Sequence, residues 1–469
     1  FEAKYGDKMS SVLDTRSKQP QKFEAKASAS LLGASAFVGF SRKNFSWSNG
    51  IRYKTNRYLL GTLETKGEYK PNFLDYQTFL TYKPAKNWEI SFIGDISESH
   101  YNFTPEDRET KFGTMESVRS FKVYFDGQEK DLFRTAFAAF SIKRSFGKNT
   151  NLKFTLSAFH TNEQEKYDIQ GQYWLTQTET SENLGVGTYM EHARNYLKAN
   201  VKSFNLAFEH KIKRHEIKTG LTYRIESIKE NSKEYEMRDS SGYSIPHTGE
   251  DLMMIYSLKA KNRLDANRFE AYLQDTWKFS SKGEHTFFTL NYGIRFAHWN
   301  FNKETLVSPR VSLGIVPAFN HDVTLRFATG LYYQAPFFKE LRDTTTINGV
   351  TKATLNNKIK SQRSIHFIAG FDYRFKMQNR PYKFTAEAYY KALSNLVPYT
   401  VNNVKIVYDA SQQCSGHALG LDMKLYGEFV PGTDSWISLS VMDTKYNING
   451  KSVPLPTDQK YSVNLFFTD

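Results

Sequence analysis

The sequence predicts an all-β protein, a transmembrane antiparallel β-barrel, from an alternating strand pattern, an unusual composition and the placement of its turns. The alternation is clearest at residues 364–391, where apolar side chains occupy nearly every second position before and after a short turn at 377–381. Successive side chains of a strand point to opposite faces, so this stretch is a long hairpin with one apolar and one charged face. Full charges along a whole face suit a water-filled lumen, with lipid on the apolar side.

The composition favours the same fold class. Only 39% of the 469 residues are hydrophobic and the mean hydropathy is −0.58, yet 15% of the residues are aromatic. A soluble protein of this length would need apolar runs for about three domain cores. A membrane barrel needs apolar residues only at every second strand position, with aromatic girdles at both interfaces. No run of about 18 apolar residues occurs, so a membrane-spanning chain must form a closed barrel.

The charge and the single cysteine exclude other classes. The net charge is +14, but Lys and Arg are spread over the whole chain, unlike the basic patch of a nucleic-acid-binding protein. We therefore expect no nucleic-acid partner. Cys414 is the only cysteine, so no disulfide forms within the chain. No signal peptide is visible at Phe1, and we expect that an upstream segment has been removed.

Taken in order, residues 1–20 predict a brief strand at 5–14 followed by a linker, and the barrel pattern starts at residue 21. The first strands are expected at 23–31, 34–41 and 46–54. Tight turns then follow at 84–87, 147–149, 211–213, 281–284, 318–320, 377–380 and 430–433, many of them flanked by aromatic residues typical of a membrane-interface girdle. The polar segments between them, at 97–117, 161–197, 226–266, 334–362 and 393–416, are expected to be long extracellular loops. The hairpins give about 18 strands.

Seven stretches also resemble known motifs. They are residues 5–14, DIQGQYWL at 168–175, GVGT at 185–188, HARNYL at 192–197, GLYYQAPF at 330–337, EFVPGTDSW at 428–436 and PTDQ at 456–459. Together they resemble the barrel of TonB-dependent outer-membrane receptors, in the branch common in Bacteroidota, over nearly the whole chain.

The resemblance implies a 22-stranded type of barrel in the outer membrane of a Gram-negative bacterium, with an N-terminal plug in the lumen. Residues 1–20 would be the end of the plug domain and a linker, and residues 21–469 a barrel incomplete at the C-terminus. It further implies that a nutrient (a siderophore, glycan, peptide or similar cargo) binds at extracellular loops and is imported with energy from TonB, which acts on an N-terminal segment missing from this sequence. Membrane lipid and lipopolysaccharide are implied partners, and a surface lipoprotein or other outer-membrane subunits are further candidates.

The candidate cargo-binding residues are mostly aromatic and lie where a strand passes into a loop over the lumen. They are Tyr332, Tyr333, Gln334, Phe337 and Phe338, and in a longer loop Tyr173 and Trp174. Aromatic faces stack on sugar rings or on apolar cargo; the alternative for these rings is a membrane-interface girdle with loop packing. The charged residues Arg295, Arg326, Asp372, Arg374 and Glu387 are expected to face the lumen and to bond to one another or to the plug.

We expect neither catalysis nor a cofactor. The sequence offers no nucleophile with a base and an orienting group, and no close pair of carboxylates. His210 and His215 flank a turn without a third metal ligand, Cys414 has no second thiol beside it, and the acidic loop segments lack the spacing of a calcium loop. The alternative function is a structural barrel subunit of a larger outer-membrane assembly, such as a secretion or surface-display complex.

Overall fold

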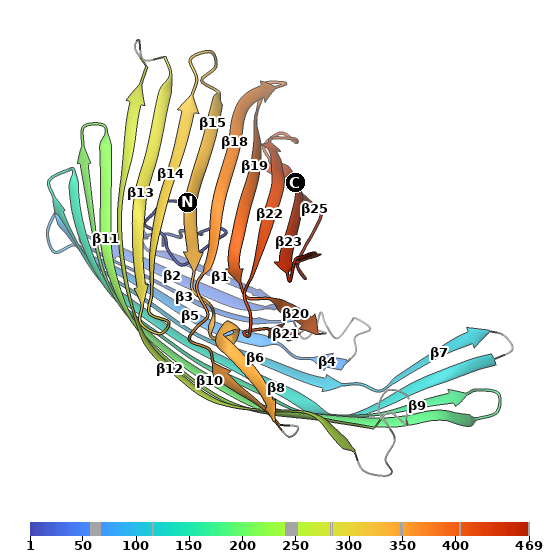
Figure 1. Cartoon of the computed structure of the whole chain (residues 1–469). Coiled ribbons are helices and arrows are strands. Elements are labelled where there is room, and N and C mark those ends of the chain that lie inside the picture. Colours follow the sequence, from blue (N-terminus) through green and yellow to red (C-terminus); the bar gives the residue numbers. More distant parts are fainter. Residues whose placement is uncertain are drawn as a thin grey trace.

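The computed structural model describes residues 1–56, 67–114, 117–239, 252–281, 283, 285–347, 350–402 and 405–467. These residues form one sheet of 23 strands, a separate two-stranded sheet and a single 3-10 turn, η1 (Phe338–Leu341) (Figure 1). The predicted all-β fold is confirmed.

Eighteen of the 23 strands make the wall, because five are short branches. The wall strands are β1 (Glu24–Ser30), β2 (Gly33–Arg42), β3 (Phe45–Thr55), β5 (Asn72–Tyr82), β6 (Trp88–Pro105), β8 (Ser117–Phe146), β9 (Thr150–Gln177), β10 (Glu182–Ile212), β11 (His215–Asp239), β12 (Met253–Ser280), β13 (Phe287–Trp299), β14 (Glu304–Val316), β15 (Val323–Gln334), β18 (Gln362–Met377), β19 (Arg380–Leu396), β22 (Cys414–Gly427), β23 (Ser435–Ile448) and β25 (Tyr461–Phe466). The branches are β4 (Gly67–Tyr69), β7 (Arg108–Thr114), β16 (Arg342–Ile347), β17 (Val350–Leu355) and β24 (Lys451–Pro454), and the small sheet is β20 (Tyr399–Asn402) with β21 (Lys405–Tyr408). The predicted number of strands agrees with this wall.

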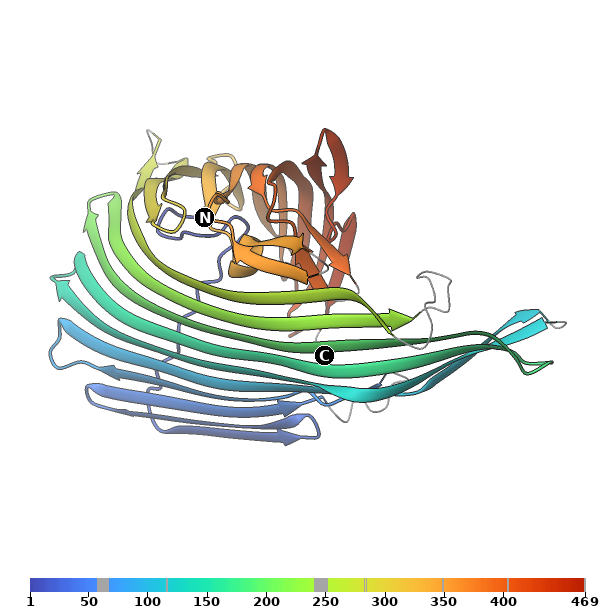
Figure 2. The ribbon, with the colours of Figure 1, turned by 60° about the horizontal axis from the view of Figure 1, so that its bottom comes forward.

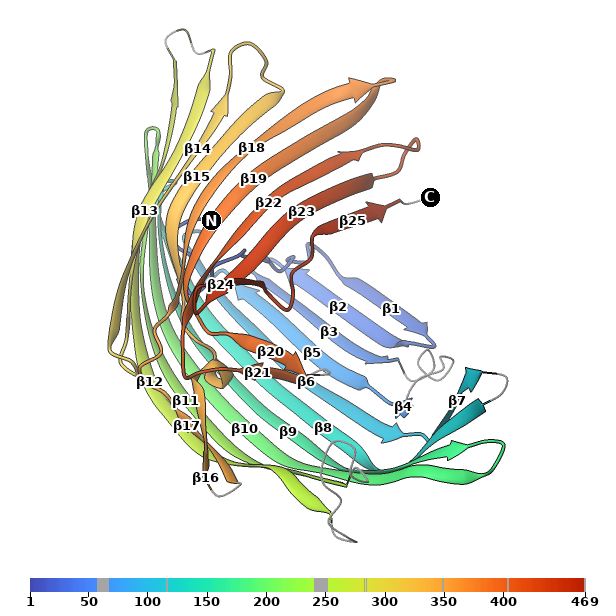
Figure 3. The same ribbon diagram turned by 45° about the vertical axis from the view of Figure 1, so that its right-hand side comes forward.

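Each wall strand pairs antiparallel with the next, so the sheet curls around a concave inner face. Its two margins are β1 and β25, which face each other in Figure 3, and no pairing joins them among the described residues. A short parallel contact at Leu258–Ala260 of β12 attaches the branch strand β17.

The predicted turns are correctly placed. Six of the seven fall between successive wall strands, and the seventh, at 281–284, lies partly outside the described residues. The hairpin at 364–391 has the expected register, with Phe375 opposite Tyr382 and Met377 opposite Arg380. Aromatic rings gather beside these turns: the centroids of Phe375 and Tyr382 are 5.6 Å apart, and those of Tyr382 and Phe429 are 5.5 Å apart. This placement is that of a girdle at one membrane interface.

The long extracellular loops were predicted wrongly in large part, because most of their residues continue the strands. Residues 161–177 and 182–197 belong to β9 and β10, and Glu165 lies opposite Asn195 in their ladder. Figure 2 shows β8 to β12 running far past the other strands. The segments at 334–362 and 393–416 hold η1 and four short strands. Outside the membrane both faces of a strand meet water, so the apolar alternation disappears while the backbone hydrogen bonds continue.

The brief strand predicted at residues 5–14 is also absent. Residues 1–23 contain no strand, and the N-terminus lies inside the curve of the wall (Figure 1). Here the backbone bonds to side chains of the wall: Arg295 donates to the carbonyls of Ala3 and Lys4, at 3.2 and 3.1 Å. Because these side chains satisfy backbone groups, the segment needs no strand partner.

The two faces of the wall differ as a membrane barrel requires. Phe327, Phe367 and Leu419 point outward and are about half exposed, whereas Arg310 and His366, on the inner face, are 6% and 2% exposed. Within the described ranges, no helix has the length and apolar character needed to span a membrane.

The strand extensions give a test of the fold. The amides of residues 163–176 lie between β8 and β10 in a continuous ladder, so we expect them to exchange hydrogen slowly. Residues 10–19, which belong to no strand, should exchange within the dead time and serve as the control. Equal exchange in the two segments, measured by mass spectrometry on the detergent-solubilised protein, would show that 163–176 is a loop.

Candidate functional site

Two buried arginines hold the N-terminal segment against the inner wall. Arg310 on β14 donates to the carbonyls of Glu2 and Tyr5, at 2.8 and 2.6 Å. Arg295 on β13 donates to the two carbonyls between them, those of Ala3 and Lys4, and also pairs with Glu270, at 2.7 Å. Guanidinium groups carry several donors in a fixed fork, which suits them to bind irregular backbone. The segment is therefore attached by its main chain.

Aromatic packing reinforces this attachment. The Tyr332 ring stacks on His366 with centroids 4.2 Å apart and meets the Phe1 ring at 4.7 Å. The Arg310 guanidinium lies 4.3 Å from the Tyr332 centroid. Tyr332 is 2% exposed as a result. The structure thus places this predicted cargo contact beneath the N-terminal segment.

Asp7 joins the segment to the extracellular end of the lumen. One of its carboxylate oxygens accepts the Ala335 amide at 2.7 Å, and the other lies 3.3 Å from an Nη of Arg268. Arg268 in turn pairs through Nε with Glu226, at 2.8 Å. Ala335 begins the connection from β15 to η1, residues 335–341, which we call the lip. One carboxylate therefore bridges the wall, the segment and the lip.

The lip is held in place by burial and by one carboxylate. Glu340 is 5% exposed and accepts the Phe337 amide at 2.7 Å and the Gln362 side chain at 2.9 Å. Burial raises the pKa of the Glu340 carboxyl, although these two hydrogen bonds act in the opposite direction. Leu341 is fully buried in a core cluster that includes Leu264 and Trp299. The lip is consequently an ordered part of the wall's extracellular end.

A cavity of about 180 Å³ lies between the lip, the wall and the N-terminal segment. It is lined by Asp7, Lys8, Val201, Glu226, Ile228, Leu264, Arg268, Trp299, Gln334, Ala335, Pro336, Phe337, Phe338 and Leu341. The Arg268 guanidinium lies 4.2 Å from the ring centroid of Trp299. The Trp299 side chain is buried, and its indole N–H has no hydrogen-bond partner among the described residues. A smaller cavity of about 40 Å³ adjoins, sharing Asp7, Arg268, Trp299 and Ala335.

The predicted cargo-binding residues fall into three groups. Gln334, Phe337 and Phe338 line the larger cavity, and Tyr333 lines the smaller one. Tyr332 is covered, as described. Tyr173 and Trp174 are separate from both cavities, because they lie near the far end of β9, where the Tyr173 hydroxyl donates to the Asp239 carbonyl at 3.1 Å (Figure 1).

Several residues of the cavity escaped sequence analysis: Asp7, Lys8, Glu226, Arg268 and Trp299. They come from the N-terminal segment and from β11 to β13, and no local motif connects them. The periodicity of β12 does place Arg268 on the charged face, which was the one available signal.

The remaining predicted lumenal charges lie deeper along the wall. Arg326 donates to Asp372 at 3.0 Å and lies 3.6 Å from Glu387. Lys383 also approaches Asp372, at 3.3 Å. Arg374 follows Asp372 by two positions on β18, so it shares that face, and its side chain is exposed. These charges border the lumen away from the lip.

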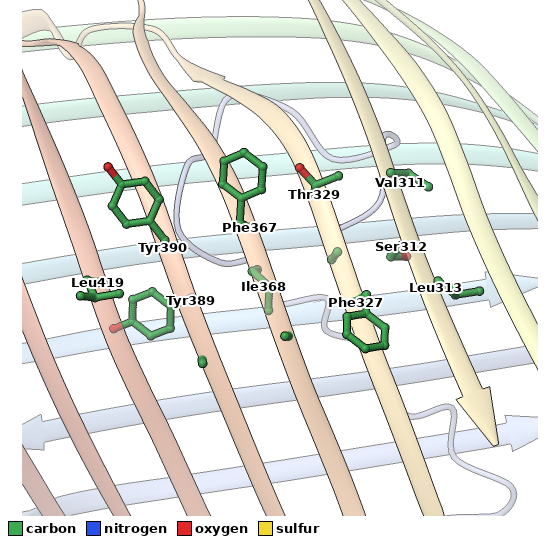
Figure 4. A pocket seen from close by; sticks show the side chains of 13 residues that line it. Val311, Ser312, Leu313, Phe327, Thr329, Phe367, Ile368, Tyr389, Tyr390 and Leu419 are labelled. Carbon is green, nitrogen blue, oxygen red and sulfur yellow. The ribbon is translucent and has the colours of Figure 1, made fainter. Parts of the chain in front are cut away.

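A further hollow faces outward and belongs to the lipid side. Its volume is about 470 Å³, and Figure 4 shows Phe327, Phe367 and Tyr390 around it. These side chains share the outward face with Leu419. No group of three or more His, Cys, Asp or Glu residues able to hold a metal occurs within the described ranges. The cavity beside the lip is therefore the candidate binding site.

Comparison of the sequence with protein families gives a match over most of the wall. The family model for the β-barrel of TonB-dependent receptor-like proteins matches residues 94–469. No curated protein sequence matches the chain at a significant level.

Solved structures share the fold. The pyoverdine outer-membrane receptor FpvA from Pseudomonas aeruginosa superposes with a TM-score of 0.59 at 11% identity, over 96% of this chain and 65% of that one. The outer-membrane transporter YddB from Escherichia coli gives 0.54 at 13%, over 93% and 61%. The RagAB peptide transporter gives 0.50 at 9%, over 91% and 51%. This chain thus spans less than two thirds of each of these structures, and identities this low show the fold alone.

The contact between Gly6 and Arg295 predicts how the N-terminal segment is released. A Cβ on Gly6 would lie 2.1 Å from Nε of Arg295, so Gly6→Ala must displace either the segment or a guanidinium that binds three groups. We expect the substitution to destabilise the attachment of the segment by about 1–3 kcal/mol, because overpacking a buried site carries a cost of that size. Hydrogen exchange at the Lys4 amide, which donates to Gln274 at 2.9 Å, should rise accordingly. Gly50→Ala, where a Cβ meets nothing within 4 Å, is the matched control. Unchanged exchange in Gly6→Ala would contradict the attachment.

The buried Glu340 predicts a pH dependence of the lip. Since the pKa of Glu340 is higher in the closed lip than in an open one, its stabilising contribution is complete below the ordinary pKa and is lost as the pH rises through the raised value. Hydrogen exchange at residues 338–341, corrected for the intrinsic rate, should therefore be slower at about pH 4 than at about pH 7. In Glu340→Gln this difference should vanish. A pH dependence that persists in this variant would assign it to another group.

Proposed function

Since the chain belongs to the family of TonB-dependent receptor β-barrels, proteins integral to the outer membrane, we propose that it forms the channel of an energised importer. In this proposal a nutrient binds at the extracellular end of the lumen, against the lip and residues 7–8. TonB then pulls on an N-terminal plug, and the cargo passes through the lumen into the periplasm.

The observation that carries the proposal is the attachment of residues 1–7 to the inner face of the wall. The segment is irregular, lies inside the wall, and is attached through side chains of the wall and through Asp7 to the lip. A structural barrel has no need for a segment that links its interior to the site facing the medium. A gated channel does, because cargo at the lip then contacts the element that must move. We assign residues 1–20 to the end of the plug on this ground.

The structural neighbours do not define the cargo of this chain, because their sequences differ too much from it. One of them is a pyoverdine receptor and another a peptide transporter, with identities of 11% and 9% to this chain. We propose a nutrient of the same broad range: a siderophore, glycan, peptide or similar molecule. Gln334, Phe337 and Phe338 would contact it, while Tyr173 and Trp174 would meet only a cargo that reaches the far extension of β9.

The proposed partners follow from the same assignment. TonB would act through an N-terminal segment outside this chain, and membrane lipid with lipopolysaccharide would cover the outward face, on which apolar side chains are exposed. A surface lipoprotein or another outer-membrane subunit would have the broad sheet formed by the extensions of β8 to β12 available for contact (Figure 2).

Uptake by the full-length receptor tests the proposal. Cells that carry the receptor without its TonB-binding segment should fail to grow on a limiting nutrient as completely as cells without the receptor, while membrane insertion remains normal. The panel would cover ferric siderophores, glycans and peptides as sole sources. If the truncated receptor supports wild-type growth on the nutrient that depends on it, the protein is a passive pore. If no nutrient depends on the receptor and its loss disrupts an outer-membrane assembly, the structural alternative replaces the importer.

A further inference from the structure

We infer that the 180 Å³ cavity receives a carboxylate-ended apolar group, such as the C-terminal residue of an apolar peptide or an aryl or alkyl acid. The inference rests on the proposed function in that it names the part of the cargo that enters beside the N-terminal segment. The cavity is too small for a whole cargo, because ligand pockets usually measure about 300–1,000 Å³. It is much larger than the roughly 10–15 Å³ that a single water needs.

Two hydrogen-bond donors at the cavity have no protein acceptor. The indole N–H of Trp299 is buried and has no partner among the described residues. Lys8 also lines the cavity; it is an exposed residue whose ammonium takes part in no ion pair within the described ranges. A buried donor without an acceptor costs free energy that a suitable ligand recovers. Both groups donate, so a ligand group that accepts hydrogen bonds suits this cavity.

The acidic groups of the cavity do not reverse this preference, because arginines already neutralise them. Asp7 lies 3.3 Å from Arg268 and 4.0 Å from Arg224. Glu226 lies 2.8 Å from Arg268 and 3.9 Å from Arg224. Glu270 lies 3.9 Å from Arg224 and 2.7 Å from Arg295, so three carboxylates face three guanidinium groups in this network, and Lys8 leaves one positive charge in excess. A bound anion would balance this excess charge, whereas Lys8 would repel a bound cation.

The rest of the cavity is apolar. Val201, Ile228, Leu264, Pro336, Phe337, Phe338 and Leu341 supply most of its lining. This apolar lining removes an alkyl or aromatic side chain of the ligand from water, which stabilises binding by about 25 cal/mol for each Å² buried. The polar donors and the apolar wall meet at Trp299, whose ring packs with Arg268. A ligand that satisfies both parts carries a carboxylate beside an apolar group.

Binding of matched small probes tests the inference. We would titrate the detergent-solubilised full-length receptor with N-acetyl-phenylalanine and with N-acetyl-phenylalaninamide, which differ only in the carboxylate, and measure affinity by ligand-observed NMR. The acid should bind about tenfold more tightly than the amide, since a charge-assisted hydrogen bond contributes at least that factor. Trp299→Phe keeps the ring and removes the N–H, and Lys8→Met keeps the stem and removes the charge. Each should abolish most of the preference for the acid over the amide.

Lys22→Met is the control, because it removes one positive charge from the same segment at an exposed position that does not line the cavity. It should bind both probes like the wild type. Equal affinity for acid and amide, no binding of either probe, or a preference that survives both cavity variants would overturn the inference. These outcomes are independent of TonB: a receptor that transports nothing still reports its preference between the two probes, and a receptor without the preference still reports its transport.

Discussion

The structure depends on the donation of hydrogen bonds from wall arginines to the carbonyls of the N-terminal segment. A curled sheet with a charged inner face and no filling would be an open, hydrated lumen. Arg295 and Arg310 bind the main chain of residues 2–5, and this fixes where Asp7, Lys8 and the lip meet. The position of the cavity beside the lip therefore follows from how the segment is attached. Side-chain identity in residues 2–5 matters less than the path of their backbone.

The strand extensions show a second constraint. The backbone of a strand in water or in a membrane must bond to its neighbours, and in β8 to β12 this bonding continues long after the lipid-facing pattern has ended. Their register is set by the membrane-embedded part, where a slip of one residue would turn apolar side chains into the lumen. The extensions inherit that register with polar residues on both faces.

Sequence analysis recovered what is encoded locally. The hairpin at 364–391 follows from alternation, and its turn follows from residues 377–380, so both agree with the structure. Gln334, Phe337 and Phe338 were found because an aromatic cluster follows a strand. The other half of the cavity was not found, because Asp7 and Arg268 are 261 positions apart and meet only through the curvature of the sheet. The lip's dependence on Glu340 was equally hidden, since its partner Gln362 belongs to another strand.

The order of the contacts along the N-terminal segment has a mechanical consequence. Phe1 packs against Tyr332, Glu2 to Tyr5 bind the arginines, and Asp7 binds the lip, so the attachments follow one another along the chain. A pull from the N-terminal side would load these attachments one after another, so that each would break separately and at low force. The same bonds loaded together in shear would resist far more strongly. Under such a pull the attachment of Asp7 to the lip is the last to bear the load.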